Sequence, residues 1–485
     1  MKIFKQITLP RILSVLSILF LASCAATPKI NLIQSAGVTM ELKESAYRIT
    51  SVAVSPDGKY VASGDMRGDV MLWDILNGKM SWKLNGHKMT AGGTAENWVL
   101  STAFTPDGKK LLTGGFSDNL LKILDVDTGK ILNNLEGHEG SLLLGTASIH
   151  SIAVSSDGKK AVTAGGDKTA RLWDLEKGAL IKIFRGHKGI GWRGHVFAVD
   201  MSPDGKYSLS GGGDGTIRLW DNATGNELLK IEAHPTSLIR DSVVNSVAFA
   251  KDGMRAFSGG EVGKEGKLKF WDLKTGNIVR ESEKLHDGHP VKGLEVSHDG
   301  KYLLSTDGDV VIRLWDVDTG RLLKTYKGYG GFRGMGNYDA VIFHPDGKRF
   351  ISGSSDASVR ITDLNTGIEN ALLVSFPDGE WLVITSEGYY NASEKGAQYL
   401  NVKVGEKKYD MNLFYDVFYR PDIVAAKLQG QDIKDLITIT MKDAIKNPPP
   451  SIEFTSTPTD AASSKVKVCY QAKSTGGGIG EIRLF

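Results

Sequence analysis

Apolar and polar side chains alternate, with a period of two residues, along many short segments of this 485-residue chain. The stretch SVAVSPDGKYVASG (Ser51–Gly64) holds two such segments joined by a Pro-Asp-Gly turn. A period of two is typical of β-strands, whereas an amphipathic helix needs a period near 3.6. Two further strand-like segments follow at Asp69–Asp74 and Lys79–Leu84. The pattern therefore predicts a unit of four short antiparallel strands.

This unit repeats along the chain. An Asp-Gly turn recurs at intervals of 47 to 50 residues, with its glycines at Gly58, Gly108, Gly158, Gly205, Gly253, Gly300 and Gly347. A fixed period of this size is typical of solenoids, propellers or arrays. Four-stranded sheets stacked in a line would expose their edges, whereas closure into a ring buries the sheet faces against one another. The repeat therefore predicts a propeller.

The repeated unit resembles that of WD-repeat β-propellers. Its third strand ends in Trp-Asp at Trp73-Asp74, Trp173-Asp174, Trp220-Asp221, Trp271-Asp272 and Trp315-Asp316. A Gly-His partner stands at Gly86-His87, Gly137-His138, Gly186-His187 and Gly288-His289. The resemblance covers residues 41–376. It implies an all-β fold, a seven-bladed WD-repeat β-propeller, followed by a small mixed α/β connector and an incomplete β-sandwich-like tail.

Two segments compete for the last outer strand of the ring. Lys29–Gln34 falls where a fourth strand would precede the first complete unit, and Glu369–Phe376 follows the seventh unit. Residues 25–40 are therefore predicted to form an N-terminal linker with a candidate closing strand. The sequence leaves the choice between the two segments open.

Blades of WD-repeat proteins characteristically join a histidine, a Ser or Thr, an aspartate and a tryptophan by hydrogen bonds. The resemblance implies three complete sets here: His138/Thr163/Asp167/Trp173, His187/Ser210/Asp214/Trp220 and His289/Ser305/Asp309/Trp315. Such sets satisfy buried imidazole and indole N–H groups. A His–Asp–Ser combination is also typical of hydrolase triads. Because the set recurs with the blade period, we assign it to the scaffold rather than to an active site.

Most of the extra length in each repeat lies in the loop from the fourth strand to the next blade. In WD-repeat propellers these loops emerge on one rim, where partners bind. Aromatic and arginine side chains dominate the energy of protein interfaces. The alternative is that the aromatic rings cover their own blades, and the two interpretations are evenly balanced. The candidates for binding another protein or peptide are Trp98, Trp192, Arg193, Arg240, Phe332 and Arg333.

The first 24 residues are typical of a secretory signal, with a basic start and an apolar stretch from Ile12 to Ala22. They end in Leu-Ala-Ser-Cys, which resembles the lipobox of bacterial lipoproteins and implies a lipid on Cys24. The alternative is an ordinary signal peptide that contains a cysteine. Ala25 is not the aspartate that retains such proteins in the inner membrane, so we expect a cell-envelope protein anchored by its lipid, with the outer membrane favoured.

Charge and composition exclude other classes. The formal net charge is +3, and Lys2, Lys5 and Arg11 of the N-terminal segment account for it, so the body is close to neutral. A neutral body lacks the basic surface that nucleic acids bind, and we expect no nucleic-acid partner. No loop carries a convincing metal-ligand pattern, and we expect no cofactor or metal.

The pattern changes after Phe376. Residues 377–447 are predicted to form a hairpin and a helical connector, and residues 448–485 a proline linker with a truncated β-sandwich-like segment. This tail resembles the connector of bacterial proteins that couple a WD-repeat propeller to a caspase-like peptidase. The chain itself shows no signature of a peptidase domain, because Cys469 lies in a strand-like segment.

These observations favour a lipid-anchored protein-binding scaffold of the cell envelope without catalytic activity. A first alternative is the sensory or regulatory portion of a caspase-like peptidase. A second alternative is a small-molecule hydrolase or oxidoreductase that uses the propeller channel. Polar side chains that converge on the channel without blade periodicity would support that last class.

Overall fold

The protein is described by a computed structural model that covers most of the propeller and part of each end of the chain. The described residues are 31–35, 38–42, 46–87, 97–116, 118–140, 148–234, 242–262, 265–282, 289–307, 311–327, 340–404, 406–440, 443–444, 451–456 and 469–473. Among the predicted positions, Cys24, Arg240, Asp309, Phe332 and Arg333 lie outside these residues.

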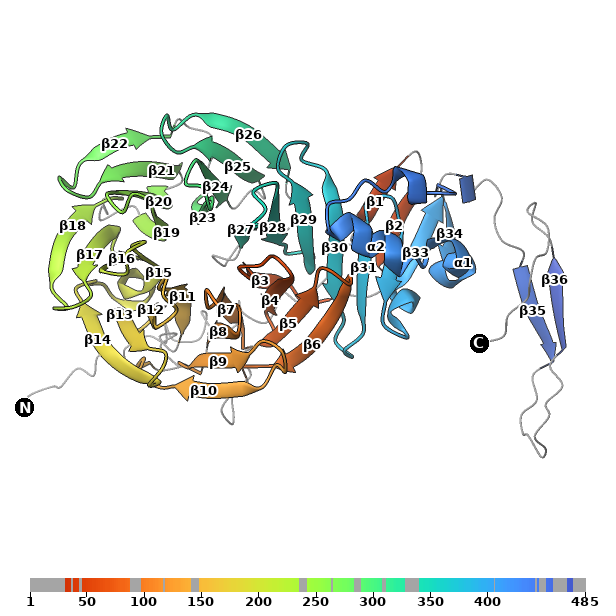
Figure 1. Ribbon diagram of the computed structural model, residues 1–485, viewed down its shortest axis with the longest axis horizontal. Helices are drawn as coiled ribbons and strands as arrows, with labels where there is room; N and C mark the ends of the chain where they lie inside the picture. Colours follow the sequence, from red (N-terminus) through yellow and green to blue (C-terminus); the bar gives the residue numbers. More distant parts are fainter. Residues whose placement is uncertain are drawn as a thin grey trace, which may run out of the picture.

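Seven antiparallel sheets stand around a central axis, each built from consecutive strands of the chain (Figure 1). Their strands, blade by blade, are β3 (Ile49–Val54), β4 (Tyr60–Asp65), β5 (Asp69–Asp74) and β6 (Lys79–Asn85); β7 (Val99–Phe104), β8 (Lys110–Gly115), β9 (Leu121–Asp125) and β10 (Ile131–Leu135); β11 (Ile149–Val154), β12 (Lys160–Gly165), β13 (Thr169–Asp174) and β14 (Ala179–Arg185); β15 (Val196–Met201), β16 (Tyr207–Gly212), β17 (Thr216–Asp221) and β18 (Glu227–Glu232); β19 (Ser242–Phe249), β20 (Arg255–Val262), β21 (Glu265–Asp272) and β22 (Ile278–Glu281); β23 (Val291–Val296), β24 (Tyr302–Asp307), β25 (Val311–Asp316) and β26 (Leu322–Lys327); and β27 (Val341–Phe343), β28 (Arg349–Gly353), β29 (Ser358–Asp363) and β30 (Glu369–Ser375). The seven-bladed propeller predicted from the repeat is therefore the observed fold.

The repeated Asp-Gly turn shapes the start of each blade. In the first blade the Ser55 hydroxyl donates to Asp57 Oδ1 at 2.7 Å, and the backbone N–H of Lys59 donates to the same oxygen at 3.1 Å. Gly58 then adopts a left-handed φ of 72°, which costs glycine little. The turn holds β3 and β4 in register, so that Ala53 pairs with Ala62.

The last blade, and not the N-terminal segment, supplies its own outer strand. Glu369–Ser375 forms β30 beside β29, which answers the open choice in favour of the Glu369–Phe376 segment. Asn31–Ser35 (β1) pairs instead with Val38–Leu42 (β2), and β2 pairs with Leu400–Val404 (β33), so the alternative at Lys29–Gln34 is wrong for its described part. Glu41 and Leu42 thus lie outside the propeller, which begins at β3.

The ring closes by packing between the last blade and the first. The backbone N–H of Ile49 donates to the Ser354 carbonyl at 3.1 Å, and His344 Nε2 lies 3.1 Å from the Gly58 carbonyl. Lys83 Nζ donates across the same junction to the Phe376 carbonyl at 2.8 Å. Closure therefore uses hydrogen bonds and apolar contact rather than a shared strand.

A second unit packs against this junction (Figure 1). Two strands, β31 (Trp381–Thr385) and β32 (Tyr390–Ala392), extend the last blade, and β33 pairs with β34 (Lys407–Asp410) in the sheet that contains β1 and β2. The helices of this unit are α1 (Tyr415–Phe418) and α2 (Pro421–Leu428), with 3₁₀ turns at Gly396–Tyr399, Met411–Phe414 and Lys434–Leu436.

Helix α2 connects this unit to the first and last blades. Gln429 Nε2 donates to the Leu76 carbonyl at 2.9 Å, and Asn391 Nδ2 donates to the Gly78 carbonyl at 2.9 Å. The Arg349 guanidinium of the last blade donates to the Leu428 carbonyl. One continuous apolar core therefore joins the two closing blades to the second unit.

Beyond these units, Ser451–Ser456 (β35) and Cys469–Lys473 (β36) pair as an antiparallel ribbon. Cys469 pairs with Ser456 in this ribbon. Within the described part of the chain, none of the helices combines the length and the apolar character that crossing a bilayer requires.

Candidate functional site

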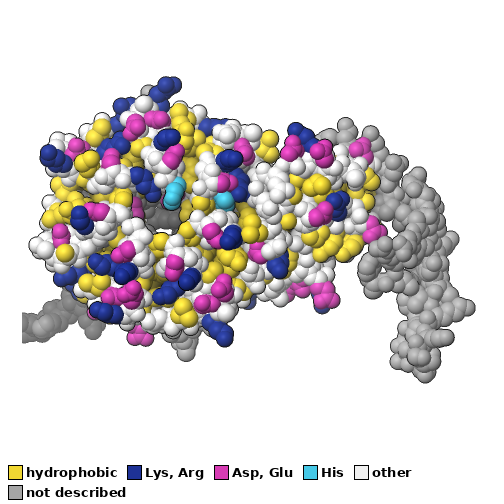
Figure 2. All heavy atoms as spheres, viewed as in Figure 1, with side chains coloured by type: hydrophobic (Ala, Val, Ile, Leu, Met, Phe, Trp, Pro, Cys, Tyr) yellow, Lys and Arg dark blue, Asp and Glu magenta, His cyan; other side chains and the backbone are white. Residues whose placement is uncertain are grey.

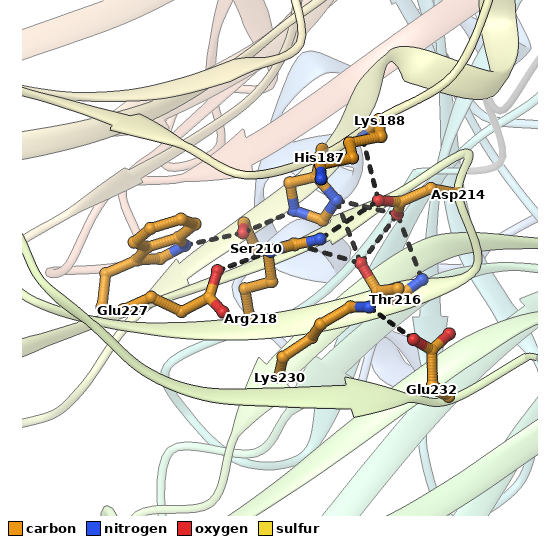
Figure 3. Close-up of polar contacts among 10 residues, drawn as sticks. His187, Lys188, Ser210, Asp214, Thr216, Arg218, Glu227, Lys230 and Glu232 are labelled. Carbon is orange, nitrogen blue, oxygen red and sulfur yellow. Dashed lines mark hydrogen bonds and ion pairs between the residues drawn. The ribbon is translucent and has the colours of Figure 1, made fainter.

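The fourth blade brings together all four members of its predicted set (Figure 3). His187 Nδ1 lies 2.8 Å from Asp214 Oδ1, and His187 Nε2 lies 2.8 Å from Ser210 Oγ. The indole N–H of Trp220 donates to the same Ser210 oxygen at 2.9 Å. Strands β16 and β17 place the serine and the tryptophan as diagonal neighbours on one face of the sheet, and the turn between the strands places Asp214.

The third blade has the same arrangement. His138 lies 3.0 Å from Asp167 Oδ1 and 2.7 Å from Thr163 Oγ1, and Trp173 Nε1 donates to that threonine at 2.8 Å. In the sixth blade Trp315 Nε1 donates to Ser305 Oγ at 2.8 Å, and His289 is partly buried. Asp309 lies outside the described residues, so the last set is seen in part.

A further set escaped the sequence analysis. His87 lies 2.8 Å from Asp118 Oδ2 and 2.9 Å from Thr113 Oγ1 in the second blade. Asp118 lies one residue further from Thr113 than Asp167 lies from Thr163, and Leu124 replaces the tryptophan. The Gly86-His87 pair was the signal that pointed to this set.

The protonation of these groups follows from their partners. Burial opposes ionisation of Asp167 and Asp214, yet the hydrogen bonds from His138 and His187 hold the pKa of each aspartate well below its usual range. Each aspartate therefore stays charged and accepts the Nδ1 proton of its histidine, which leaves Nε2 as the acceptor for the serine or threonine hydroxyl.

This geometry does not suit a hydrolase triad. The Ser210 hydroxyl already makes two hydrogen bonds, because it donates to His187 and accepts from Trp220. Ser210 is also fully buried, so a substrate carbonyl has no path to its oxygen. The set ties the strands of a blade together.

The rim candidates Trp98 and Trp192 belong to one aromatic cluster. Trp98 stacks on Phe116 with ring centroids 5.3 Å apart, and Phe116 stacks in turn near Trp192 at 6.4 Å. Trp192 also lies 4.8 Å from the His195 ring and 6.3 Å from the Phe197 ring. These residues come from the second, third and fourth blades, so the cluster does not follow the repeat.

The Trp192 side chain is held in place by its turn and is also exposed to solvent. It lies in a 3₁₀ turn, Gly191–Gly194, whose Trp192 carbonyl accepts the His195 N–H at 3.2 Å. The Trp192 side chain remains 51% exposed, and neighbouring Ile190 is 93% exposed. Arg193 is exposed beside them. Of the predicted rim residues within the described chain, Trp98 and Trp192 thus share one cluster.

A pair of histidines lies beneath Trp192. His150 Nε2 is 3.1 Å from His195 Nδ1 and 2.9 Å from Ser148 Oγ. Burial lowers the pKa of His150 to about 3, and burial together with the nearby Lys168 charge lowers the pKa of His195 to about 4. Both rings are therefore neutral at physiological pH and act as part of the apolar support of Trp192. The sequence analysis missed both histidines, because they lie in strands or at strand starts.

The first strands of the blades line a central channel, which encloses a cavity of about 330 Å³. Figure 2 shows a hollow at the middle of the ring on the face drawn there. At one register position of the first strand, five residues before the glycine of the Asp-Gly turn, four blades carry alanine, at Ala53, Ala103, Ala153 and Ala248. The fourth and sixth blades carry Asp200 and Glu295 in the equivalent registers.

These two carboxyl groups differ in their partners. Asp200 accepts the backbone N–H of Phe249 at 2.7 Å and that of Met201 at 2.8 Å, so it joins the fourth blade to the fifth. Burial raises the pKa of Asp200 to about 6. Burial, with the Asp200 charge, raises the pKa of Glu295 to about 8, against the opposing charge of Lys251. Within the described residues, no His, Cys, Asp or Glu side chains gather in a group of three that could hold a metal.

The ring of four-stranded blades, with histidine, aspartate, serine or threonine, and tryptophan joined inside the blades, defines a propeller of the WD-repeat class. Seven successive segments match the WD domain, G-beta repeat family, at residues 38–74, 78–125, 129–174, 178–221, 225–272, 280–316 and 320–363. The matches span more than half of the chain, and the chain belongs to this family.

Curated relatives carry the same repeats. The chain is 27% identical over 272 residues to autophagy-related protein 16 of Arabidopsis thaliana, covering 55% of this chain and 48% of that protein. It is 27% identical to protein tipD of Dictyostelium discoideum, over 66% of this chain and 40% of that protein. It is 23% identical to the guanine nucleotide-binding protein subunit beta of Saccharomyces cerevisiae, over 66% of this chain and 78% of that protein. The chain thus spans half or less of the length of the first two relatives.

Proposed function

We propose that this chain is a protein-binding scaffold that contacts another protein or peptide through the loop face of its propeller, without catalysis or a nucleic-acid partner. The observation that carries the proposal is the exposed Trp192 ring on its aromatic support. Interface hot spots are enriched in tryptophan and arginine, and Trp192 and Arg193 stand together on this rim. The yeast relative named as a subunit of a guanine nucleotide-binding protein supports a role within an assembly.

The fold alone does not account for this cluster. At the strand position that holds His150 and Phe197 in the third and fourth blades, other blades carry Thr50, Asn245 and Lys292. Blades therefore form without aromatic rings there. A large ring that is held in place loses little conformational entropy when a partner covers it, which favours binding.

Replacing Trp192 by alanine should abolish or strongly reduce capture of the partner in a pull-down from envelope extract, with the loss of a hot-spot anchor as the reason. Leu228→Ala is the matched control, because Leu228 is 52% exposed on the outer strand of the fourth blade. Identification of captured proteins by mass spectrometry gives the readout. An identical set of captured proteins for wild type and Trp192→Ala would remove the loop-face proposal.

The anchor is a separate part of the proposal. We propose that Cys24 carries a lipid that holds the protein in the cell envelope, with the outer membrane favoured. Its support is the Leu-Ala-Ser-Cys sequence after an apolar stretch. The resemblance of residues 377–485 to connectors of caspase-like peptidases, and with it a regulatory role, stays a prediction.

Cys24→Ser should move the protein from the membrane fraction to the soluble fraction, because each buried methylene of a lipid chain contributes about 0.8 kcal/mol to membrane binding. Cys469→Ser, which removes the other cysteine, should leave the distribution unchanged. Fractionation followed by immunoblotting measures both. Retention of Cys24→Ser in the membrane fraction would contradict a lipid anchor at this position.

A further inference from the structure

The loop that carries Trp192 differs from its surroundings in charge. Between Glu176 and Asp200 the sequence contains five lysine or arginine residues and no aspartate or glutamate. Lys188 and Arg193 are exposed within this loop. Lys168, from the neighbouring turn of the third blade, is exposed and donates to the Gly189 carbonyl at 2.8 Å. Three cationic side chains therefore surround the Trp192 turn.

Two of the described carboxylates close to this loop, Asp214 and Asp167, are already committed inside the blades. Asp214 accepts the Lys188 backbone N–H at 3.1 Å as well as the His187 ring, and it forms an ion pair with Arg218. Asp167 pairs with His138 and Arg171 in the same manner. The exposed acids Glu136 and Glu139 flank the preceding Gly-His pair, one loop away. Within the described part of the chain, the exposed Lys168 and Lys188 thus keep a positive field on the outer side of the Trp192 loop.

The apolar part of this surface is open. Ile190 and Trp192 are both exposed, and a side chain built at Gly191 would meet no atom within 4 Å among the described residues. Gly191 has a φ of 58°, and Gly213 packs so closely under the turn that a Cβ there would lie 2.3 Å from the Trp192 carbonyl oxygen. Gly213 therefore supports one side of the turn, while the opposite side, at Gly191, is open.

We propose that the ledge formed by Ile190 and Trp192, bordered by Lys168 and Lys188, binds an acidic peptide segment of the partner that carries an apolar or aromatic side chain. This inference rests on the proposed function and names its partner's chemistry. The apolar side chain lies on Trp192 and Ile190, and the carboxylates of the segment pair with the two lysines. Electrostatic complementarity of this kind raises the association rate and selects acidic over basic segments.

The test uses the full chain and two synthetic peptides. One short fluorescein-labelled peptide alternates glutamate with leucine and tryptophan, and its counterpart has lysine in place of each glutamate. Fluorescence anisotropy measures the dissociation constant of each. We expect the acidic peptide to bind at least about tenfold more tightly, and the preference to shrink as salt is raised, because the contributing charges are exposed.

Variants separate the apolar contribution from the ionic one. Trp192→Ala should weaken binding of the acidic peptide about tenfold or more, and the double change K168E/K188E should reverse the preference between the peptides. Leu228→Ala and Lys230→Glu, on the exposed outer strand β18, are the matched controls and should change neither affinity. Circular dichroism checks that each variant is folded.

Equal affinity for the two peptides, with Trp192 still required, would overturn the acidic preference and leave the loop-face scaffold intact. Binding of the acidic peptide that survives both Trp192→Ala and the double change K168E/K188E would overturn the site. Absence of binding by either peptide would overturn the proposed chemistry, while the pull-down with Trp192→Ala tests the scaffold separately.

Discussion

Replacing Asp214 by alanine is expected to lower the free energy of unfolding by about 3–5 kcal/mol, the size found when one partner of a buried charge pair is removed. Asp214 accepts hydrogen bonds from His187, from the Lys188 N–H and from the Thr216 hydroxyl, and it pairs with Arg218. Its removal leaves a buried imidazole N–H without its acceptor and a buried guanidinium with one fewer anion. Urea denaturation followed by circular dichroism measures the change.

Asp221→Ala in the same blade is the matched control. Asp221 accepts the Thr224 N–H at 2.7 Å and the Ala223 N–H at 3.0 Å, but it is partly exposed at the end of β17. We expect a much smaller loss for Asp221→Ala than for Asp214→Ala, because water replaces these bonds. Asp214→Asn keeps an oxygen acceptor for His187 but loses the charge. Its loss of unfolding free energy should therefore lie between those of Asp214→Ala and Asp221→Ala. A cost for Asp214→Ala no larger than that for Asp221→Ala would contradict a stabilising role of the buried set.

The propeller was predictable because its information is local and repeated. All seven blades carry the Asp-Gly turn, and five of them also carry the Trp-Asp end of the third strand within fewer than 50 residues, so each copy supports the others. The pairing of Val38–Leu42 with Leu400–Val404 has no such support. Alternation indicates that a segment is a strand, but it does not identify a partner more than 350 residues away.

The candidate site was predictable in part for the same reason. Trp192 stood out as a tryptophan in a glycine-rich loop, whereas Phe116, His195 and Phe197 join it from other turns and strands. Their sequence separations follow no period, because the ring and not the chain brings them together. The carboxyl group of Glu295 is a similar case, since its meaning depends on the alanines that occupy the same position in other blades.

Glu295→Gln is expected to remove a pH dependence of stability that the wild-type protein shows between about pH 5 and pH 8. Burial, together with the Asp200 charge, raises the pKa of Glu295 to about 8 in the folded protein, above its value in the unfolded chain. A carboxyl group with a raised folded-state pKa contributes stability that is fully present below its unfolded pKa. That contribution is lost as the pH rises through about 8, because the folded protein must then hold a second charge beside Asp200.

The glutamine variant is neutral at every pH, so its advantage over the wild type should grow with pH. We expect equal unfolding free energies near pH 4.5 and a variant more stable by about 1–3 kcal/mol near pH 8.5, reduced from the full conversion of the pKa shift because the channel admits water. Asp200 titrates over part of this range in both proteins and cancels in the comparison, except for its coupling to Glu295. Glu176→Gln is the control, because Glu176 is exposed and lies 3.8 Å from Lys159. Parallel pH profiles for wild type and Glu295→Gln would show that the Glu295 carboxyl ionises in the channel as freely as in water, and that the two acidic side chains do not interact across the ring.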